Sequence, residues 1–266
     1  MNQGNYFYGQ GRVYLSKRDS DRRVNWRWIG DVSSLNIALT YEQQVGKVSR
    51  GGSLLQAQRH ITARNGGITA TWHDVSADNL AILLYGEQYK YRQNWVSEEQ
   101  LPVGIVAGNR ICLEFQNVRD VVLSGLTEGH DYTVDADWGA IDFLTTPAEQ
   151  PVIASYDYAS YQAVPVLTST PGEFGLRYES INLAENSRKT LVELYRVNID
   201  PVGMLELINT GNNLVGLETT SLILPDLQKT PSRELGMFGR ISMINDFRTI
   251  TYNDEIDFNG EHNFAY

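Results

Sequence analysis

The sequence predicts a mainly β fold, a β-sandwich or barrel with one flanking α-helix. Aromatic and β-branched residues recur in short alternating runs, and turn residues interrupt the runs at intervals of roughly ten, as all-β sandwiches and barrels require. The length of 266 residues suffices for one large β domain or two small ones. The runs that carry the strand signal are residues 11–15, 111–115, 121–123, 140–144, 152–158, 175–183 and 191–199.

A strand is predicted at residues 35–41, the first element of a series of strand, loop, strand and helix. Apolar and small or polar residues alternate there from Leu35 to Tyr41, which is typical of a strand with one packed face. Glycine and serine are frequent in the polar segment that follows, so we expect a mobile loop. That segment consists of Glu42, Gln43, Gln44, Val45, Gly46, Lys47, Val48, Ser49, Arg50, Gly51, Gly52, Ser53 and Leu54.

Extended structure is predicted to resume after the loop, at residues 61–72. Residues 65–67, Asn-Gly-Gly, form either a bulge or a tight turn within it. The single convincing helix follows, with Ser76 as its N-cap and Asp78 in its first turn. Gly86 suits the left-handed residue just past the helix end. Three leucines share one face at helical spacing: Leu80, Leu83 and Leu84.

The pattern predicts one main domain between two arms. Closing strands of the same sheets are expected near residues 195–199, 203–208 and 222–224. We place an N-terminal arm at residues 1–10 and a β domain at 11–239, elaborated between about residues 88 and 187. Residues 240–266 form an acidic C-terminal arm, which either packs on a neighbouring subunit or frays.

The formal charge of −10 argues against a surface that grips nucleic acid through its phosphates. Residues 43–73 hold four basic residues and no acid, whereas residues 98–157 hold eleven acids and two arginines. Either both are solvated faces, or the basic segment of one copy meets the acidic surface of another. The candidate acidic surface, or lumen lining, comprises Glu98, Glu99, Glu114, Asp120, Glu128, Asp131, Asp135, Asp137 and Asp142.

The sequence contains none of the common catalytic signatures. A nucleophile elbow, a P-loop, an H-E-x-x-H pair and a G-x-G-x-x-G turn are all absent. His73 and Asp74 would point to opposite faces of a strand and could not hydrogen-bond there. We therefore predict no enzyme, no catalytic residue and no cofactor.

One segment has a composition that could bind a metal ion. Four aspartates crowd residues 131–142 and could wrap a calcium ion, but a loop counted from Asp135 has Thr146 where an EF-hand needs glutamate. The alternative, two strands joined by a polar turn at residues 135–139, leads us to assign no metal. Cys112 is the only cysteine, which excludes an internal disulfide, and we expect it to be buried in a strand.

The order of elements resembles the tail tube (major tail) proteins of long-tailed bacteriophages. Strand, glycine-containing loop, strand and helix follow one another from Gly30 to Gly86, and the closing strands match the end of the same domain. The residue runs that carry the resemblance are Ile-Gly-Asp-Val-Ser at 29–33, Trp-His-Asp-Val-Ser-Ala-Asp-Asn-Leu at 72–80, Leu-Tyr-Arg-Val at 194–197, Leu-Glu-Leu-Ile at 205–208 and Leu-Pro-Asp at 224–226.

This resemblance implies a structural virion protein that assembles into hexameric rings. Inner strands of the subunits would join one β-barrel, and stacked rings would form a tube through which the genome passes. The loop at residues 42–56 would reach the adjacent ring. The implied partners are further copies of the chain, other tail proteins at the tube ends and DNA that passes without specific binding.

The same resemblance places the protein in the virion tail after synthesis in the host cytoplasm. No stretch approaches the roughly 18 uncharged apolar residues of a membrane span, so no membrane partner is expected. Two alternatives remain open. One is a related ring that does not polymerise, such as a distal-tail, hub or terminator protein. The other is a carbohydrate-binding or hydrolytic β-sandwich that uses some of the five tryptophans and fifteen tyrosines.

Overall fold

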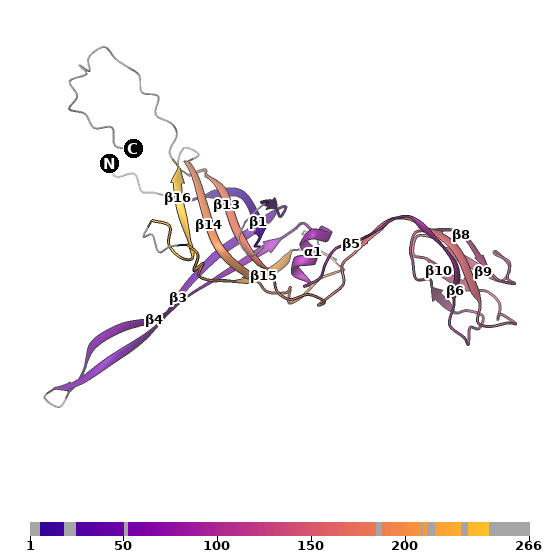
Figure 1. Ribbon diagram of the computed structural model, residues 1–266, viewed down its shortest axis with the longest axis horizontal. Coiled ribbons are helices and arrows are strands. Elements are labelled where there is room, and N and C mark those ends of the chain that lie inside the picture. Colours follow the sequence, from indigo (N-terminus) through magenta and orange to yellow (C-terminus); the bar gives the residue numbers. More distant parts are fainter. Residues whose placement is uncertain are drawn as a thin grey trace, which may run out of the picture. The chain divides into compact units, whose positions relative to one another are not determined.

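The structure is a computed structural model that describes residues 6–18, 25–50, 53–184, 188–208, 210–211, 216–229 and 234–244. It confirms the mainly β fold, and the described residues contain one helix. The chain divides into two compact units, which Figure 1 shows in the colours of the sequence. We call Met1–Asp74 together with Gly172–Tyr266 the sheet unit, and Val75–Pro171 the inserted unit.

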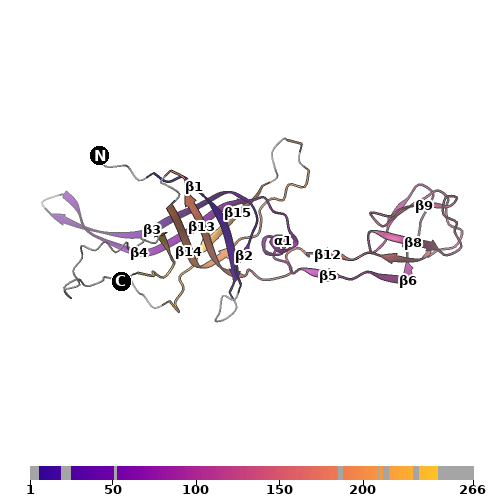
Figure 2. The same cartoon turned by 90° about the horizontal axis from the view of Figure 1, so that it is seen from above.

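The sheet unit is one antiparallel sheet of eight strands. The order is β2-β1-β13-β14-β15-β4-β3, and β16 also pairs with β14. The first seven of these strands are labelled in Figure 2. The strands are β1 (Gly9–Lys17), β2 (Arg27–Trp28), β3 (Val32–Arg50), β4 (Ser53–Trp72), β13 (Glu173–Asn182), β14 (Arg188–Ile199), β15 (Leu217–Ile223) and β16 (Gly239–Ile244).

One face of this sheet is apolar and the other is charged, because side chains alternate along each strand. Buried cross-strand neighbours such as Leu15 and Leu176 lie on the apolar face, and each contributes roughly 1.5–3 kcal/mol by leaving water. On the opposite face Glu193 accepts hydrogen bonds from Arg177 at 3.2 Å and Arg240 at 2.7 Å. These three residues are cross-strand neighbours on β13, β14 and β16.

The sheet forks beside β14. Its first half, Lys189 to Leu194, pairs with β16, whereas its last three residues, from Val197 to Ile199, pair with β15. Strand β13 pairs with β14 on the other side along both halves. The fork therefore separates β16 from the strands β15, β4 and β3.

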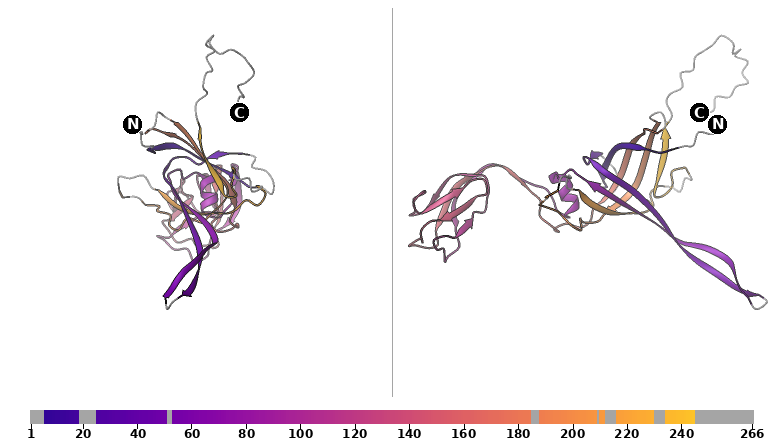
Figure 3. Two further views of the ribbon diagram at one scale, coloured as in Figure 1. Left: turned by 90° about the vertical axis from the view of Figure 1, so that its left-hand side faces the viewer. Right: turned by 180° about the vertical axis from the view of Figure 1, so that it is seen from behind.

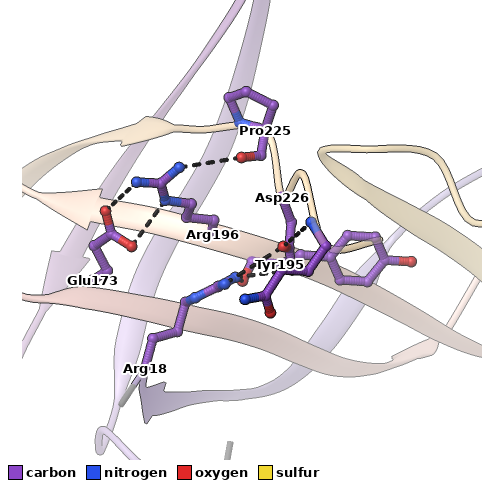
Figure 4. A network of polar contacts seen from close by, with 7 residues as sticks. Arg18, Glu173, Tyr195, Arg196, Pro225 and Asp226 are labelled. Atoms are coloured by element: carbon purple, nitrogen blue, oxygen red, sulfur yellow. Dashed lines mark hydrogen bonds and ion pairs between the residues drawn. The ribbon is translucent and has the colours of Figure 1, made fainter. Parts of the chain in front are cut away.

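Two arginine–carboxylate pairs close one end of the sheet (Figure 4). Arg18, just past β1, donates hydrogen bonds to Oδ2 of Asp226 and to the Tyr195 carbonyl, both at 2.9 Å. Arg196 donates to the two carboxylate oxygens of Glu173 at 2.8 and 2.5 Å, which lowers the Glu173 pKa. Asp226 is only 3% exposed, so its charge depends on the arginine for stabilisation.

The inserted unit contains the helix, a two-stranded ribbon and a small β-sandwich. The helix α1 spans Ala77–Leu83, and the ribbon pairs β5 (Tyr89–Tyr91) with β12 (Tyr161–Ala163). One three-stranded sheet has the order β7-β10-β9 and the other β6-β11-β8. Their strands are β6 (Asn94–Gln100), β7 (Arg110–Cys112), β8 (Val118–Leu123), β9 (Tyr132–Asp135), β10 (Ala140–Phe143) and β11 (Ile153–Tyr158).

Both of these sheets contribute to one hydrophobic core. Ile141 and Phe143 of β10 pack in the same cluster as Leu123 of β8 and Ala154 of β11, and all four are almost completely buried. Tyr132 closes the cluster and its hydroxyl donates to the Val121 carbonyl. The inserted unit therefore has a core of its own, and its bounds overlap the segment expected to elaborate the domain.

The helix begins after Ser76 as predicted, but the prediction for Gly86 is wrong. The left-handed residue past the helix is Tyr85, with φ of 50°. Gly86 lies so close to another segment that a Cβ there would be 2.0 Å from the Pro165 carbonyl oxygen. Glycine is required at this position because of the close backbone approach. The Ser76 side chain makes no capping hydrogen bond.

Two further expectations need correction. Cys112 is on strand β7, but it is exposed, because its neighbour Ile111 faces the sandwich core and adjacent residues alternate. Residues 203–208 are described without strand pairing, although a closing strand was expected there. Of the expected arms, residues 9–10 belong to β1 and 240–244 to β16, whereas 1–5 and 245–266 lie outside the described residues.

Candidate assembly surface

Strands β3 and β4 extend far beyond the rest of the sheet. They pair from Val32 and Trp72 as far as Arg50 and Ser53, whereas β15 accompanies β4 only up to Gly66. We call the two-stranded remainder, residues 40–50 and 53–65, the arm. Figure 3 shows it in purple as it leaves the sheet.

The arm replaces the mobile loop predicted at residues 42–54, and that prediction of its conformation is wrong. Residues 42–50 and 53–54 are strand, while 51–52 lie outside the described residues. Glycine and polar residues have weak strand propensity, but in an antiparallel hairpin the partner strand supplies cross-strand hydrogen bonds to alternate residues. The pairing shifts register after Glu42 and after Gly46, so β-bulges absorb the irregular sequence. Its expected role between rings remains a prediction.

The described side chains of the arm give it a basic character. Lys47, Arg59 and Arg64 are exposed, and Glu42 is its only acid. The Arg59 guanidinium lies 5.1 Å from the ring centroid of Tyr41 and also donates to its hydroxyl. This cation–π contact joins β3 to β4 within the arm and contributes about 0.5–1 kcal/mol at such an exposed site.

An apolar groove of about 480 Å³ lies where the arm meets the fork of the sheet. Ile37, which precedes the arm on β3, pairs with the buried Ile68, so the apolar face of the sheet continues up to the start of the arm. Leu39 nevertheless remains 77% exposed and Ile241 65% exposed. Arg64 and Arg240 also border the groove, and no carboxylate is found among the described residues that line it. The groove walls include Ile37, Leu39, Ile61, Ile223, Phe238 and Ile241.

A second, more polar pocket lies on the charged face of the sheet. Glu179 is the single carboxylate among the described residues that line it, and it is paired with Arg177 at 2.6 Å. Neither of these two pockets therefore contains the pair of carboxylates that a hydrolytic β-sandwich would need. Within the described residues no group of three or more His, Cys, Asp or Glu side chains could hold a metal ion.

The nine candidate acidic residues all lie in the inserted unit. Arg110 bridges two of them across β7, β10 and β9, with 2.5 Å to Asp135 and 2.8 Å to Asp142. The hydrogen bond to Asp135 raises the Arg110 pKa. Glu99 accepts hydrogen bonds from the Tyr156 hydroxyl and the Glu114 N–H. The exposed candidates are Glu98, Glu114, Asp120, Glu128 and Asp137.

Asp131 has a structural role that sequence reasoning missed. Its carboxylate accepts from the Thr127 N–H and the Thr145 hydroxyl, and His130 Nδ1 lies nearby, all at 2.9 Å. The Thr127 bond is the largest cause of the lowered Asp131 pKa, followed by His130 and Thr145. Through these hydrogen bonds the carboxylate links the turn before β9 to the segment just after β10.

Asp131→Asn should lower the melting temperature of the inserted unit at pH 7, because the amide group opposes one of these donors. A carboxyl with a lowered folded pKa stabilises the fold above its unfolded pKa, and this contribution disappears as the pH falls through the folded value. The difference from wild type should therefore shrink below about pH 4. Thermal unfolding by circular dichroism between pH 2 and 7 measures it.

The matched control is Asp137→Asn, which removes an exposed charge from the same hairpin. It should leave the melting temperature nearly unchanged at every pH. Equal melting curves for wild type and the Asp131 variant at pH 7 would contradict the role assigned to Asp131.

The fold and surface place the chain among mainly β proteins with an extended hairpin arm and an inserted β-sandwich. Within this class, the chain belongs to the family described as "Protein of unknown function UCP028589", whose profile matches residues 6–242. No curated protein matches the chain. In the described residues no helix is long and apolar enough to cross a membrane.

Proposed function

We propose that the chain is a structural subunit of a long-tailed bacteriophage that self-assembles into stacked hexameric rings and forms the tail tube. The observation that carries the proposal is the arm together with the apolar groove beside it, where Leu39 and Ile241 are exposed. The proposal also draws on the resemblance in the order of elements. It assigns no chemistry to the chain.

An isolated two-stranded hairpin is marginally stable in water, so a long one gains most from a partner. In the described residues β3 pairs only with β4, and β16 only with β14, which leaves one edge of each strand open. Open edges promote uncontrolled association unless a neighbour covers them. A closed ring of subunits would pair such edges and cover the apolar groove.

The distribution of charge supports the same proposal. Residues 98–157 account for nine of the ten net negative charges, whereas the arm is basic. Opposite charges on separate units favour a defined orientation of one copy toward the next. Any acidic residues that face the lumen would repel phosphates and let DNA slide.

Electron microscopy of the purified protein over a range of concentrations tests this proposal. Hollow filaments with a regular axial repeat are the expected result. Single closed rings would instead favour a distal-tail, hub or terminator protein. A monomer at every concentration would contradict self-assembly by this chain alone.

A further inference from the structure

A short apolar segment of the sheet unit has no strand partner in the described part of the chain. Residues 203–208, Gly-Met-Leu-Glu-Leu-Ile, have the composition of a strand but are described without pairing. Met204, Leu207 and Ile208 are 79%, 82% and 80% exposed. Exposed apolar surface costs roughly 25 cal/mol per Å², so this segment favours a covered state.

The groove where the arm meets the fork of the sheet has properties that complement this segment. It is apolar, and the open edges of two strands lie beside it. Strand β4 has no described partner on its second side between Asn65 and Gln58, and β16 has none opposite β14. An extended segment can add to such an edge through main-chain hydrogen bonds while its side chains fill the groove.

The charges of the segment and of the groove indicate how the two would be oriented. The single charge of the segment is Glu206, which is exposed. The described lining of the groove includes two arginines and no carboxylate, and Arg240 already donates to Glu193 at 2.7 Å. Arg64 is therefore the cation that suits Glu206.

We propose that residues 203–208 of one copy dock as an added strand in the groove of a second copy, with Glu206 beside Arg64. Donor and acceptor are different surfaces, so the contact is heterologous and repeats from copy to copy into a ring or a filament. The inference rests on the self-association in the proposed function, but not on the tube or on its phage origin.

Cross-linking tests the contact directly. The exposed Cys112 is first changed to Ser. A tagged Ile208→Cys protein, whose cysteine shares a strand face with Glu206, is then mixed with an untagged Ile241→Cys protein under mild oxidation. We expect a mixed disulfide dimer at least tenfold above the yield with Leu227→Cys, a control position that is 80% exposed in the same unit. Equal yields would overturn the proposal.

A charge exchange tests the orientation in solution. Glu206→Arg and Arg64→Glu should each weaken association in sedimentation velocity, by roughly tenfold if the pair contributes about 1.4 kcal/mol. The double variant should recover most of the loss. Glu218→Arg, an exposed acid on β15, is the control and should associate like wild type.

The outcomes separate this inference from the proposed function. Discrete oligomers that respond to the charge exchange, without filaments, would support the docking and contradict the tube. Normal filaments from both single variants would overturn the docking and leave the tube standing. A chain that never associates would overturn both.

Discussion

Shortening the arm should abolish filament formation and leave a folded subunit. Residues 45–59 are replaced by Asn-Gly, because Gln44 and His60 are directly opposite each other and this dipeptide favours the two-residue hairpin turn. The variant loses three basic residues and most of the exposed hairpin. The rest of the sheet unit should keep its fold, since β15 pairs with β4 only from Gly66 to Trp72, outside the arm.

The measurement pairs electron microscopy with circular dichroism of the isolated subunit. An unchanged melting temperature would show that the rest of the subunit is folded. The length and number of filaments measure assembly. A full-length arm with Gln58→Ser serves as the control and should polymerise normally. Filaments of normal length from the shortened variant would contradict the role of the arm.

Local periodicity is sufficient to predict several elements of both units. The alternation from Leu35 to Tyr41 correctly indicates a strand with one apolar face, and the Ser76 signal correctly marks the helix start. Such patterns depend only on residues close together in sequence, so they can be recognised without knowing which strand will pair with them. The same is true of the hairpin at residues 132–143, where the polar turn was expected.

Features that depend on distant partners were not predictable in this way. The polar segment at 42–50 becomes a strand because β4 pairs with it, and Cys112 is exposed because Ile111 fills the core. Gly86 is fixed by the approach of Pro165, which is 79 residues away in sequence. The groove requires β16 and the arm base to meet, although 180 residues separate Ile61 from Ile241.

Removal of the Arg18 side chain should strongly destabilise the sheet unit. The Arg18–Asp226 pair joins the end of β1 to the segment after β15, and the two side chains are 19% and 4% exposed. Arg18→Ala leaves the Asp226 carboxylate in a buried position without its arginine. Breaking a buried pair costs roughly 3–5 kcal/mol, and we expect about 3 kcal/mol because Arg18 retains some contact with water.

Urea unfolding measured by tryptophan fluorescence gives the free energy of unfolding for this variant. Lys17→Ala, one position earlier on the exposed part of β1, is the matched control and should change stability by less than about 0.5 kcal/mol. Adding Asp226→Asn to Arg18→Ala should recover part of the loss, since the neutral amide costs less to bury. A recovery would show that the loss comes from the buried charge of Asp226. Equal losses in the single and double variants would instead attribute the loss to the missing contact between Arg18 and the Tyr195 carbonyl.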